Sequence, residues 1–161
     1  MTGSYTIIQD SREKNGWTFA SYEKCKELKT RTLCTGDYTA RGLEKYLAIE
    51  RKASTGELNL NLGKKRKAFE AEMKRLSKFR FKYIICEFSI EDLMKFPENS
   101  GIPKKQWQFT RMNGKFMLKK LYEYQDLYDI PTIFCGDRLA AEERAIRIFD
   151  EVSEMLLRGS N

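Results

Sequence analysis

The sequence predicts an α/β protein in which a mixed central sheet is flanked by helices. Short apolar runs with strand composition recur along the chain, and in its second half each is followed by apolar residues at helical spacing. The 161 residues, of which 41% are hydrophobic, match the common size of one domain with a buried core. We therefore predict a single domain over residues 1–161, with elements in the order strand, helix, three strands, helix, strand, helix, strand, helix.

The first half of the chain carries the predicted strands of greatest interest. An apolar run occupies 5–10, a run rich in β-branched residues occupies 29–34, and a third run occupies 46–52. A glycine followed by Asp37 marks a bend after the second run. A hairpin that pairs the second and third runs would bring Asp37 close to Glu50.

The third of these strands has two different faces. Because alternate side chains of a strand point to opposite sides, Ala48, Glu50 and Lys52 share one face, and Leu47 and Ile49 share the other. Glu50 and Lys52 can therefore reach the same ligand.

The second half of the chain supplies two strands and the larger helices. Short apolar strands are predicted at 81–88 and 130–135, and Asp137 is the predicted N-cap of a closing helix. Apolar residues at helical spacing predict the core-facing sides of three helices. These residues are Phe69, Met73 and Leu76; Met117, Leu121, Tyr124 and Tyr128; and Leu139, Ile146, Phe149, Val152 and Leu156.

Composition excludes several classes of function. The chain has no histidine, which removes imidazole bases and histidine metal ligands, and its four cysteines form no Cys-x-x-Cys pair that would suggest zinc. No apolar run is long enough to span a membrane, and the N-terminus lacks a signal-peptide pattern. We expect an intracellular protein, cytoplasmic if it is bacterial or viral, that makes no contact with membranes.

Asp37, Glu50 and Lys52 are the candidate catalytic residues. Carboxylate oxygens suit hard divalent cations such as Mg²⁺ or Mn²⁺, and a lysine can neutralise charge that develops on a phosphodiester. The set therefore predicts a metal-dependent nuclease. The plainer alternative is a turn aspartate with an exposed Glu/Lys pair on an edge strand, because short motifs often match by chance.

Three motifs in order give the chain a resemblance to a known family. The matching residues are Asp10, Arg12 and Glu13 after the first strand, then Gly36, Asp37 and Tyr38, then Glu50, Arg51 and Lys52. This pattern resembles the XPF-type nucleases of the PD-(D/E)XK superfamily, and it covers about the first half of the chain. One position departs from it, since Gly56 stands where the family has an aspartate, and the neighbouring Glu57 is a possible substitute.

The resemblance implies a restriction-endonuclease-like fold and a Mg²⁺- or Mn²⁺-dependent deoxyribonuclease. It makes Asp37 and Glu50 the principal metal ligands, with the Arg51 carbonyl and Asp10 as further ligands. Lys52 would orient the attacking water or stabilise charge on the phosphate, and Arg12 would contact phosphate. The family generally cuts branched DNA, which implies flap, fork or junction substrates in repair or recombination.

Two basic segments predict contacts with nucleic acid. The whole chain has a net charge of +7, and its basic residues are concentrated in two segments. Residues 64–82 include nine basic and two acidic residues, and residues 104–120 include six basic and no acidic residues. Solvent-exposed faces are the alternative reading. The aromatics of the second segment, Trp107 and Phe109, could stack on unpaired bases, and Trp107 could instead hold the loop to the core. The candidate contact residues are Arg12, Arg51, Lys67, Lys74, Lys78, Lys104 and Lys105.

Two other functions and the assembly state stay open. A catalytically inactive nuclease-fold module would bind DNA without cutting it, and an interaction protein would use its basic helix on an acidic partner. We expect DNA that is branched or contains a single strand as the main partner. The chain lacks a helix-hairpin-helix domain, so a homodimer through the closing helix or a separate partner subunit is possible.

Overall fold

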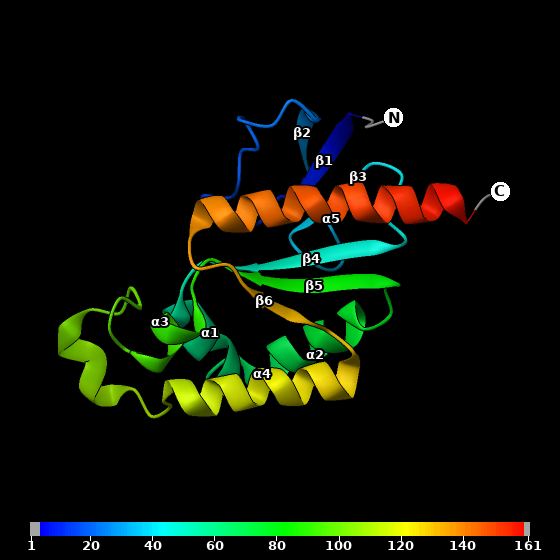
Figure 1. The fold of residues 1–161 in the computed structure, drawn as a ribbon. Helices are drawn as coiled ribbons and strands as arrows, with labels where there is room; N and C mark the ends of the chain where they lie inside the picture. The colour runs from blue at the N-terminus through cyan, green and yellow to red at the C-terminus, as the bar shows by residue number, and fades with distance from the viewer. Residues whose placement is uncertain (1–3, 160–161) are drawn as a thin grey trace.

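A six-stranded mixed sheet forms the centre of the protein in the computed structural model, which describes residues 4–159 (Figure 1). Its strand order is β2-β1-β3-β4-β5-β6. The pairs β1–β2, β4–β5 and β5–β6 are parallel, and β1–β3 and β3–β4 are antiparallel. The strands are β1 (Tyr5–Asp10), β2 (Cys25–Arg31), β3 (Tyr38–Ala40), β4 (Leu47–Lys52), β5 (Phe81–Cys86) and β6 (Thr132–Phe134).

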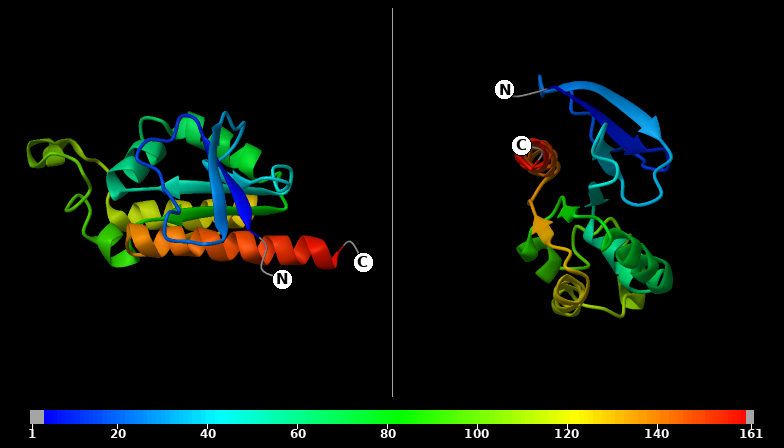
Figure 2. Two further views of the ribbon diagram at one scale, coloured as in Figure 1. Left: turned by 90° about the horizontal axis from the view of Figure 1, so that it is seen from above. Right: turned by 90° about the vertical axis from the view of Figure 1, so that its right-hand side faces the viewer.

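Helices cover both faces of the sheet, which confirms the predicted fold class. The helices are α1 (Thr55–Leu62), α2 (Arg66–Leu76), α3 (Ile90–Met94), the 3₁₀ helix η1 (Lys104–Phe109), α4 (Gly114–Tyr128) and α5 (Arg138–Arg158). The long helix α5 lies alone on one face, and α1, α2 and α4 lie on the other (Figures 1 and 2). Two hydrophobic clusters result, one on each side of β4 and β5. None of the helices within residues 4–159 has the length and hydropathy needed to cross a membrane.

Strand β4 lies in the interior of the sheet, between β3 and β5. The predicted alternation is confirmed, because Leu47 and Ile49 pack in the cluster beneath α5 whereas Ala48 packs in the cluster on the opposite face. Glu50 and Lys52 are 8% and 3% exposed. The alternative of an exposed Glu/Lys pair on an edge strand is therefore wrong.

The predicted hairpin between 29–34 and 46–52 is also wrong. β2 runs parallel to β1 at the edge of the sheet, and the short strand β3 pairs with β4 through Tyr38 and Ile49. The chain leaves the sheet after Arg31, where the backbone amide of Leu33 donates to the Asp10 carboxylate at 2.8 Å. It returns through a bend that contains a glycine with positive φ.

The predicted helix between the first two strands is absent from the described structure, in which residues 11–24 form turns and irregular backbone. Trp17 and Phe19 from this segment are buried in the cluster beneath α5. The Trp17 ring stacks on the Tyr38 ring, with the ring centroids 4.7 Å apart. The backbone amide of Trp17 donates to the Tyr38 hydroxyl at 2.8 Å. Buried aromatic side chains two residues apart thus anchor an irregular loop here in place of a helical turn.

The larger helices follow their predicted patterns closely. Asp137 caps α5 by accepting a hydrogen bond from the Ala140 amide at 2.7 Å. The predicted core-facing residues of α2, α4 and α5 are buried or partly buried, with one exception. Leu139 is 65% exposed although Ala141 in the same first turn of α5 is buried, because residues two positions apart lie on nearly opposite sides of a helix, so the assignment of Leu139 to the core is wrong.

Candidate active site

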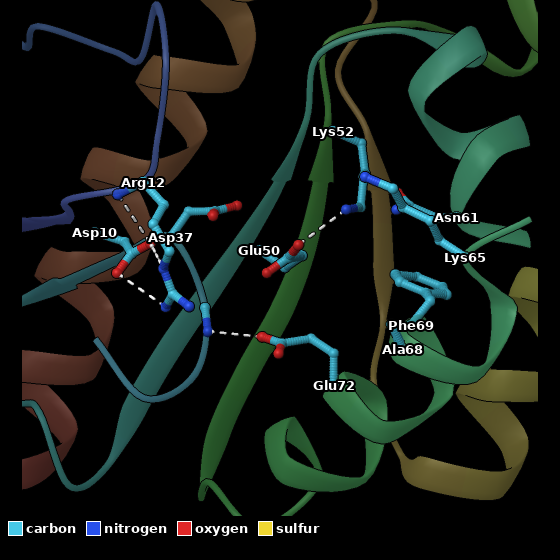
Figure 3. A pocket seen from close by; sticks show the side chains of 11 residues that line it. Asp10, Arg12, Asp37, Glu50, Lys52, Asn61, Lys65, Ala68, Phe69 and Glu72 are labelled. Carbon is cyan, nitrogen blue, oxygen red and sulfur yellow. Dashed lines mark hydrogen bonds and ion pairs between the residues drawn. The ribbon is translucent and has the colours of Figure 1, made fainter. Parts of the chain in front are cut away.

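A polar pocket of about 260 Å³ opens beside β4 and α2. Figure 3 shows Asp10, Arg12 and Asp37 on one side, Asn61, Lys65 and Phe69 on the other, and Glu50 and Lys52 between them. The lining residues are Asp10, Arg12, Gly36, Asp37, Glu50, Lys52, Asn61, Lys65, Ala68, Phe69 and Glu72. The structure therefore brings together every residue that the sequence predicts as catalytic.

Glu50 and Lys52 reach the pocket from alternate positions of β4. The Lys52 Nζ lies 2.9 Å from Glu50 Oε1 and 3.7 Å from Glu57 Oε1, and it sits 5.1 Å from the centre of the Phe69 ring. Both side chains of the pair are nearly inaccessible to solvent. Because Glu50 and Lys52 pair with Ile84 and Cys86 of β5, the sheet backbone fixes the position of this ion pair.

Asp37 is positioned by the backbone of β4. Its amide donates to the Ile49 carbonyl at 2.8 Å, and its carboxylate Oδ2 accepts from the Arg51 amide at 2.7 Å. The proximity of Asp37 to Glu50 that the sequence predicts is therefore confirmed, although the bend that carries it leads into β3 and does not close the predicted hairpin.

The carboxylates of the pocket are crowded with negative charge. Burial, together with the nearby Glu50 and Glu13, raises the pKa of Asp37 well above its ordinary value. Burial also raises the pKa of Glu50, although Lys52 opposes this shift. A cation bound between these oxygens would relieve their repulsion, so the donor set fits a hard divalent metal.

Lys52 stays protonated despite its burial. Burial lowers the pKa of Lys52, but attraction to Glu50 and Glu57 outweighs it and raises the pKa above its ordinary value. The side chain therefore offers a fixed positive charge and cannot accept a proton near neutral pH. This favours a role in stabilising negative charge over a role as general base.

Asp10 is held in a network of its own. Its carboxylate accepts from Arg12 Nε at 2.9 Å and Arg12 Nη2 at 3.2 Å, and from the Leu33 amide at 2.8 Å. Burial raises the pKa of Asp10, but the hydrogen bonds from Arg12 and Leu33 lower it below its ordinary value. Asp10 is thus ionised at the pocket wall, with Arg12 as its present partner.

No set of three or more histidine, cysteine, aspartate or glutamate side chains within residues 4–159 is arranged to hold a metal ion. Asp37 and Glu50 remain a pair of acidic donors in this arrangement. Asp10 would join them only after releasing part of its contact with Arg12. Its predicted role as a ligand, like the metal itself, stays a prediction.

The Arg51 side chain lies on the opposite face of β4 from the pocket. It is 4% exposed, and it pairs with Glu87 at 2.7 Å and with Glu13 at 3.0 Å. Trp17 adds a hydrogen bond from its Nε1 to Glu87 at 2.7 Å. The buried Arg51 side chain therefore supports β4 through its ion pairs with Glu13 and Glu87. It is not exposed at a surface where it could make the contact with nucleic acid that the sequence predicts.

Arg12 is a predicted nucleic-acid contact that lines the pocket, whereas the predicted contact lysines lie outside it. Lys67, Lys74 and Lys78 are exposed in and just after α2, and Lys104 and Lys105 are exposed in η1. Asn61 and Lys65 instead approach the candidate catalytic residues. The spacing of Lys65, Ala68, Phe69 and Glu72, at i, i+3, i+4 and i+7, places them on one side of the helix, but it does not show that this side lines the pocket.

Glu72 links α2 to the loop that carries Asp37. Its Oε1 accepts from the Gly36 amide at 3.0 Å, a contact drawn in Figure 3, and its carboxylate also pairs with Arg75. The sequence alone does not distinguish Glu72 from the other charged residues of α2. Only the docking of α2 onto the sheet shows that it faces the pocket.

Close packing against a neighbouring segment explains why a glycine occupies position 56, and the sequence does not show this contact. The Gly56 amide donates to the Ser100 carbonyl at 3.2 Å, and a Cβ atom at this position would lie 2.3 Å from that carbonyl oxygen. The segment around Ser100 therefore occupies the space that an aspartate side chain would need. Glu57 turns to the end of β4 instead, accepting from the Ala53 amide at 2.9 Å and contacting Lys52.

Replacing Gly56 by alanine is expected to reduce the free energy of unfolding by about 1–3 kcal/mol, because the added Cβ must displace backbone. Urea unfolding followed by circular dichroism measures the change. Gly159→Ala is the matched control, since the nearest atom to its Cβ lies at 3.5 Å. Equal stability of the two variants would show that the Ser100 segment moves freely away from α1.

The metal-free protein is expected to lose stability as the pH rises from about 5 to about 8. The pKa values of Asp37 and Glu50 are raised in the folded state, so the folded protein binds more protons than the unfolded chain. Their stabilising contribution is therefore complete below the ordinary carboxyl pKa and is lost as the pH passes through the raised values. Urea unfolding in EDTA across this pH range measures the slope.

Asp37→Asn is expected to be more stable than the parent without metal at about pH 8, by about 1 kcal/mol, because it removes one buried negative charge. An asparagine side chain can still accept the Arg51 amide. Its stability should depend less on pH, and added Mn²⁺ should raise the melting temperature of the parent but not of the variant. A Mn²⁺ shift of equal size in both proteins would contradict the assignment of Asp37 as a ligand.

Comparison with known proteins identifies the fold. Neither protein-family models nor curated proteins give a match to the sequence. Among solved structures, XPF from Aeropyrum pernix matches 95% of this chain with a TM-score of 0.62 and 16% sequence identity. The chain has an XPF-type nuclease fold. The same archaeal XPF in complex with DNA matches 94% of the chain, also with a TM-score of 0.62 and 16% identity.

The match to these structures covers nearly the whole chain. The chain spans 65% of the length of the first archaeal XPF structure and 66% of the second. The resemblance that the three motifs predict is thus confirmed at the level of fold.

Proposed function

We propose that this chain is a divalent-metal-dependent endonuclease that hydrolyses DNA. The observation that carries the proposal is the meeting of Asp37, Glu50 and Lys52 in one pocket of an XPF-type nuclease fold. The archaeal XPF that was solved in complex with DNA supports DNA as the ligand. Branched, flap or junction DNA in repair or recombination is the substrate that we infer from the same likeness.

Asp37 and Glu50 would hold Mg²⁺ or Mn²⁺, with Asp10 and the Arg51 carbonyl as the further donors. The metal would supply Lewis-acid activation of a water molecule and of the phosphate. Lys52 places a fixed ammonium beside the site of reaction, where it stabilises the negative charge that grows on the phosphate oxygens. Arg12, whose guanidinium is largely exposed and lines the pocket, would bind a phosphate of the strand.

The experiment that tests this function is cleavage of end-labelled single-stranded, duplex, flap and junction DNA. Each substrate is incubated with Mg²⁺, with Mn²⁺ or with EDTA. We expect cleavage that requires metal and that is fastest on substrates with a branch. Cleavage that persists in EDTA would overturn the metal mechanism, and equal rates on all substrates would overturn the preference for branches.

A catalytically inactive DNA-binding module is the second candidate. Two observations favour it: Gly56 in place of the family's aspartate, and the engagement of Asp10 by Arg12. This function predicts DNA binding of equal strength in EDTA and in Mg²⁺, with no product on any substrate. A homodimer or a partner subunit is part of either proposal, and sedimentation of the protein with and without DNA distinguishes these states.

A further inference from the structure

A second groove lies beside the catalytic pocket, on the other side of the turn between α1 and α2. It has a volume of about 900 Å³, within the range of sites that bind small ligands. The lining residues are Gly56, Asn59, Leu60, Gly63, Lys64, Ile102, Gln106, Phe109, Thr110, Arg111 and Met112. They come from α1, from the turn that follows it, and from the segment between α3 and α4, which extends outward at the left of Figure 1.

Internal contacts hold this segment in place. Ser100 is buried against the start of α1 through its hydrogen bond with Gly56. Trp107 Nε1 donates to the Ile102 carbonyl at 2.9 Å, and Lys104 lies 5.9 Å from the centre of the Trp107 ring. Of the two aromatics that the sequence singles out, Trp107 therefore serves to brace the segment.

Phe109, unlike Trp107, is exposed to solvent. It lines the groove, yet it is 73% exposed, the largest exposed fraction among the large hydrophobic residues described. The ring belongs to the last residue of η1, two positions after Trp107, and its surface faces solvent beside the groove. The ring is open to stacking.

The charge of the groove selects the ligand. Leu60, Ile102 and Met112 give it an apolar floor, Lys64 and Arg111 supply positive charge, and no carboxylate lines it. The surrounding stretch 99–122 contains six basic and no acidic residues. An exposed aromatic ring among lysine and arginine side chains is the pattern that binds unpaired nucleotides, with the base stacked on the ring and the phosphates on the cations.

We propose that this groove binds an unpaired nucleotide of a single-stranded DNA segment, with its base on Phe109 and its phosphates on Lys64 and Arg111. A paired base cannot use the site, because both faces of the base are covered inside a duplex. The proposal rests on the proposed function for its DNA substrate, and it deepens that function by naming the structure that recognises single-stranded character.

The position of the groove connects it to the catalytic pocket. Leu60 and Lys64 line the groove, whereas their neighbours in sequence Asn61 and Lys65 line the catalytic pocket. A strand that crosses this turn would place one nucleotide on Phe109 and present a nearby phosphate to Glu50 and Lys52. Substrates with an unpaired segment next to the cleaved bond would then be preferred.

Equilibrium binding in EDTA tests the proposal without cleavage. Fluorescence anisotropy compares an oligothymidylate with a blunt duplex of equal length, for the parent, Phe109→Ala, Phe109→Leu and Phe109→Trp. We expect the Ala and Leu variants to bind the single strand about tenfold more weakly, and the Trp variant to keep the parent affinity. Duplex affinity should change by less than about twofold in all four proteins.

A spectroscopic measurement reports the stacking itself. An oligonucleotide that contains 2-aminopurine should lose fluorescence on binding to the parent and keep more of it on binding to Phe109→Leu. Phe116→Ala is the matched control, because Phe116 is also an exposed phenylalanine, at 42%, but lies on α4 away from the groove. Melting temperatures confirm that all variants fold.

The outcomes separate this proposal from the nuclease proposal. Unchanged single-strand affinity in Phe109→Ala, or equal losses on both probes, would overturn the groove assignment even if the parent cuts DNA. Single-strand binding that depends on the Phe109 ring, with no metal-dependent cleavage on any substrate, would support the groove and remove the nuclease. A parent that binds neither probe would overturn both.

Discussion

Replacement of Lys52 by alanine is expected to slow metal-dependent DNA cleavage by about a thousandfold. Lys52 is the buried cation of the pocket, and Glu50, Glu57 and the Phe69 ring fix its ammonium group. Because this charge is in place before the reaction begins, it stabilises the developing negative charge without reorganisation. Single-turnover cleavage with saturating enzyme and Mg²⁺ measures the effect on the chemical step.

The variant also removes the partner of Glu50, so stability must be followed with activity. Lys52→Ala and Lys52→Met leave a buried carboxylate without its ion pair, and we expect both to melt at a lower temperature than the parent. Adding Glu50→Gln to Lys52→Met should recover stability but not cleavage. Lys26→Ala is the control, since Lys26 is exposed on the edge strand β2, outside the pocket and outside both basic segments. Cleavage by Lys52→Ala at the parent rate would refute the assigned role.

Replacement of Arg51 by methionine is expected to lower the free energy of unfolding by about 3–5 kcal/mol. The guanidinium is buried between Glu87 and Glu13, and removing it leaves two carboxylates with little solvent and no cation. The Arg51 amide that fixes Asp37 belongs to the backbone and is retained. Urea unfolding in EDTA measures the loss apart from any contribution of bound metal.

Two further variants make the Arg51 prediction specific. Arg147→Met removes a surface ion pair to Glu143 in which both side chains are more than half exposed, and it should change stability by less than about 0.5 kcal/mol. Adding Glu87→Gln to Arg51→Met should restore part of the lost stability. If Arg51→Met and Arg147→Met changed the free energy of unfolding equally, the buried ion pairs of Arg51 would contribute no more to stability than an exposed one.

The sequence predicts the side-chain arrangement of β4 well because that prediction depends on local geometry. The two-residue period of a strand places Glu50 and Lys52 on one face whatever the strand pairs with. The order of motifs likewise predicts that Asp37 joins them. What failed is the partner of the strand: β3 takes the position assigned to 29–34, since the contact between Leu33 and Asp10 turns the chain away from the sheet.

Other features depend on contacts between distant parts of the chain. The α2 periodicity identifies a core face through Phe69, but only the angle at which α2 packs on the sheet directs Lys65 and Glu72 into the pocket. Gly56 is required by Ser100, and the roles of Trp107 and Phe109 separate only when the Ile102 carbonyl is found beside one of them. Composition and residue spacing cannot predict these contacts, because they do not specify how distant segments of the chain pack together.

The interior position of β4 also determines how heat should inactivate the protein. Strands hydrogen-bonded on both sides and buried on both faces open only when the whole domain unfolds, whereas edges and loops fray at much lower cost. The amides of Glu50, Arg51 and Lys52 should accordingly be among the slowest to exchange with deuterium. The geometry of the pocket should therefore persist nearly unchanged up to the cooperative melting transition, so that activity disappears abruptly with the fold and does not decline gradually before it.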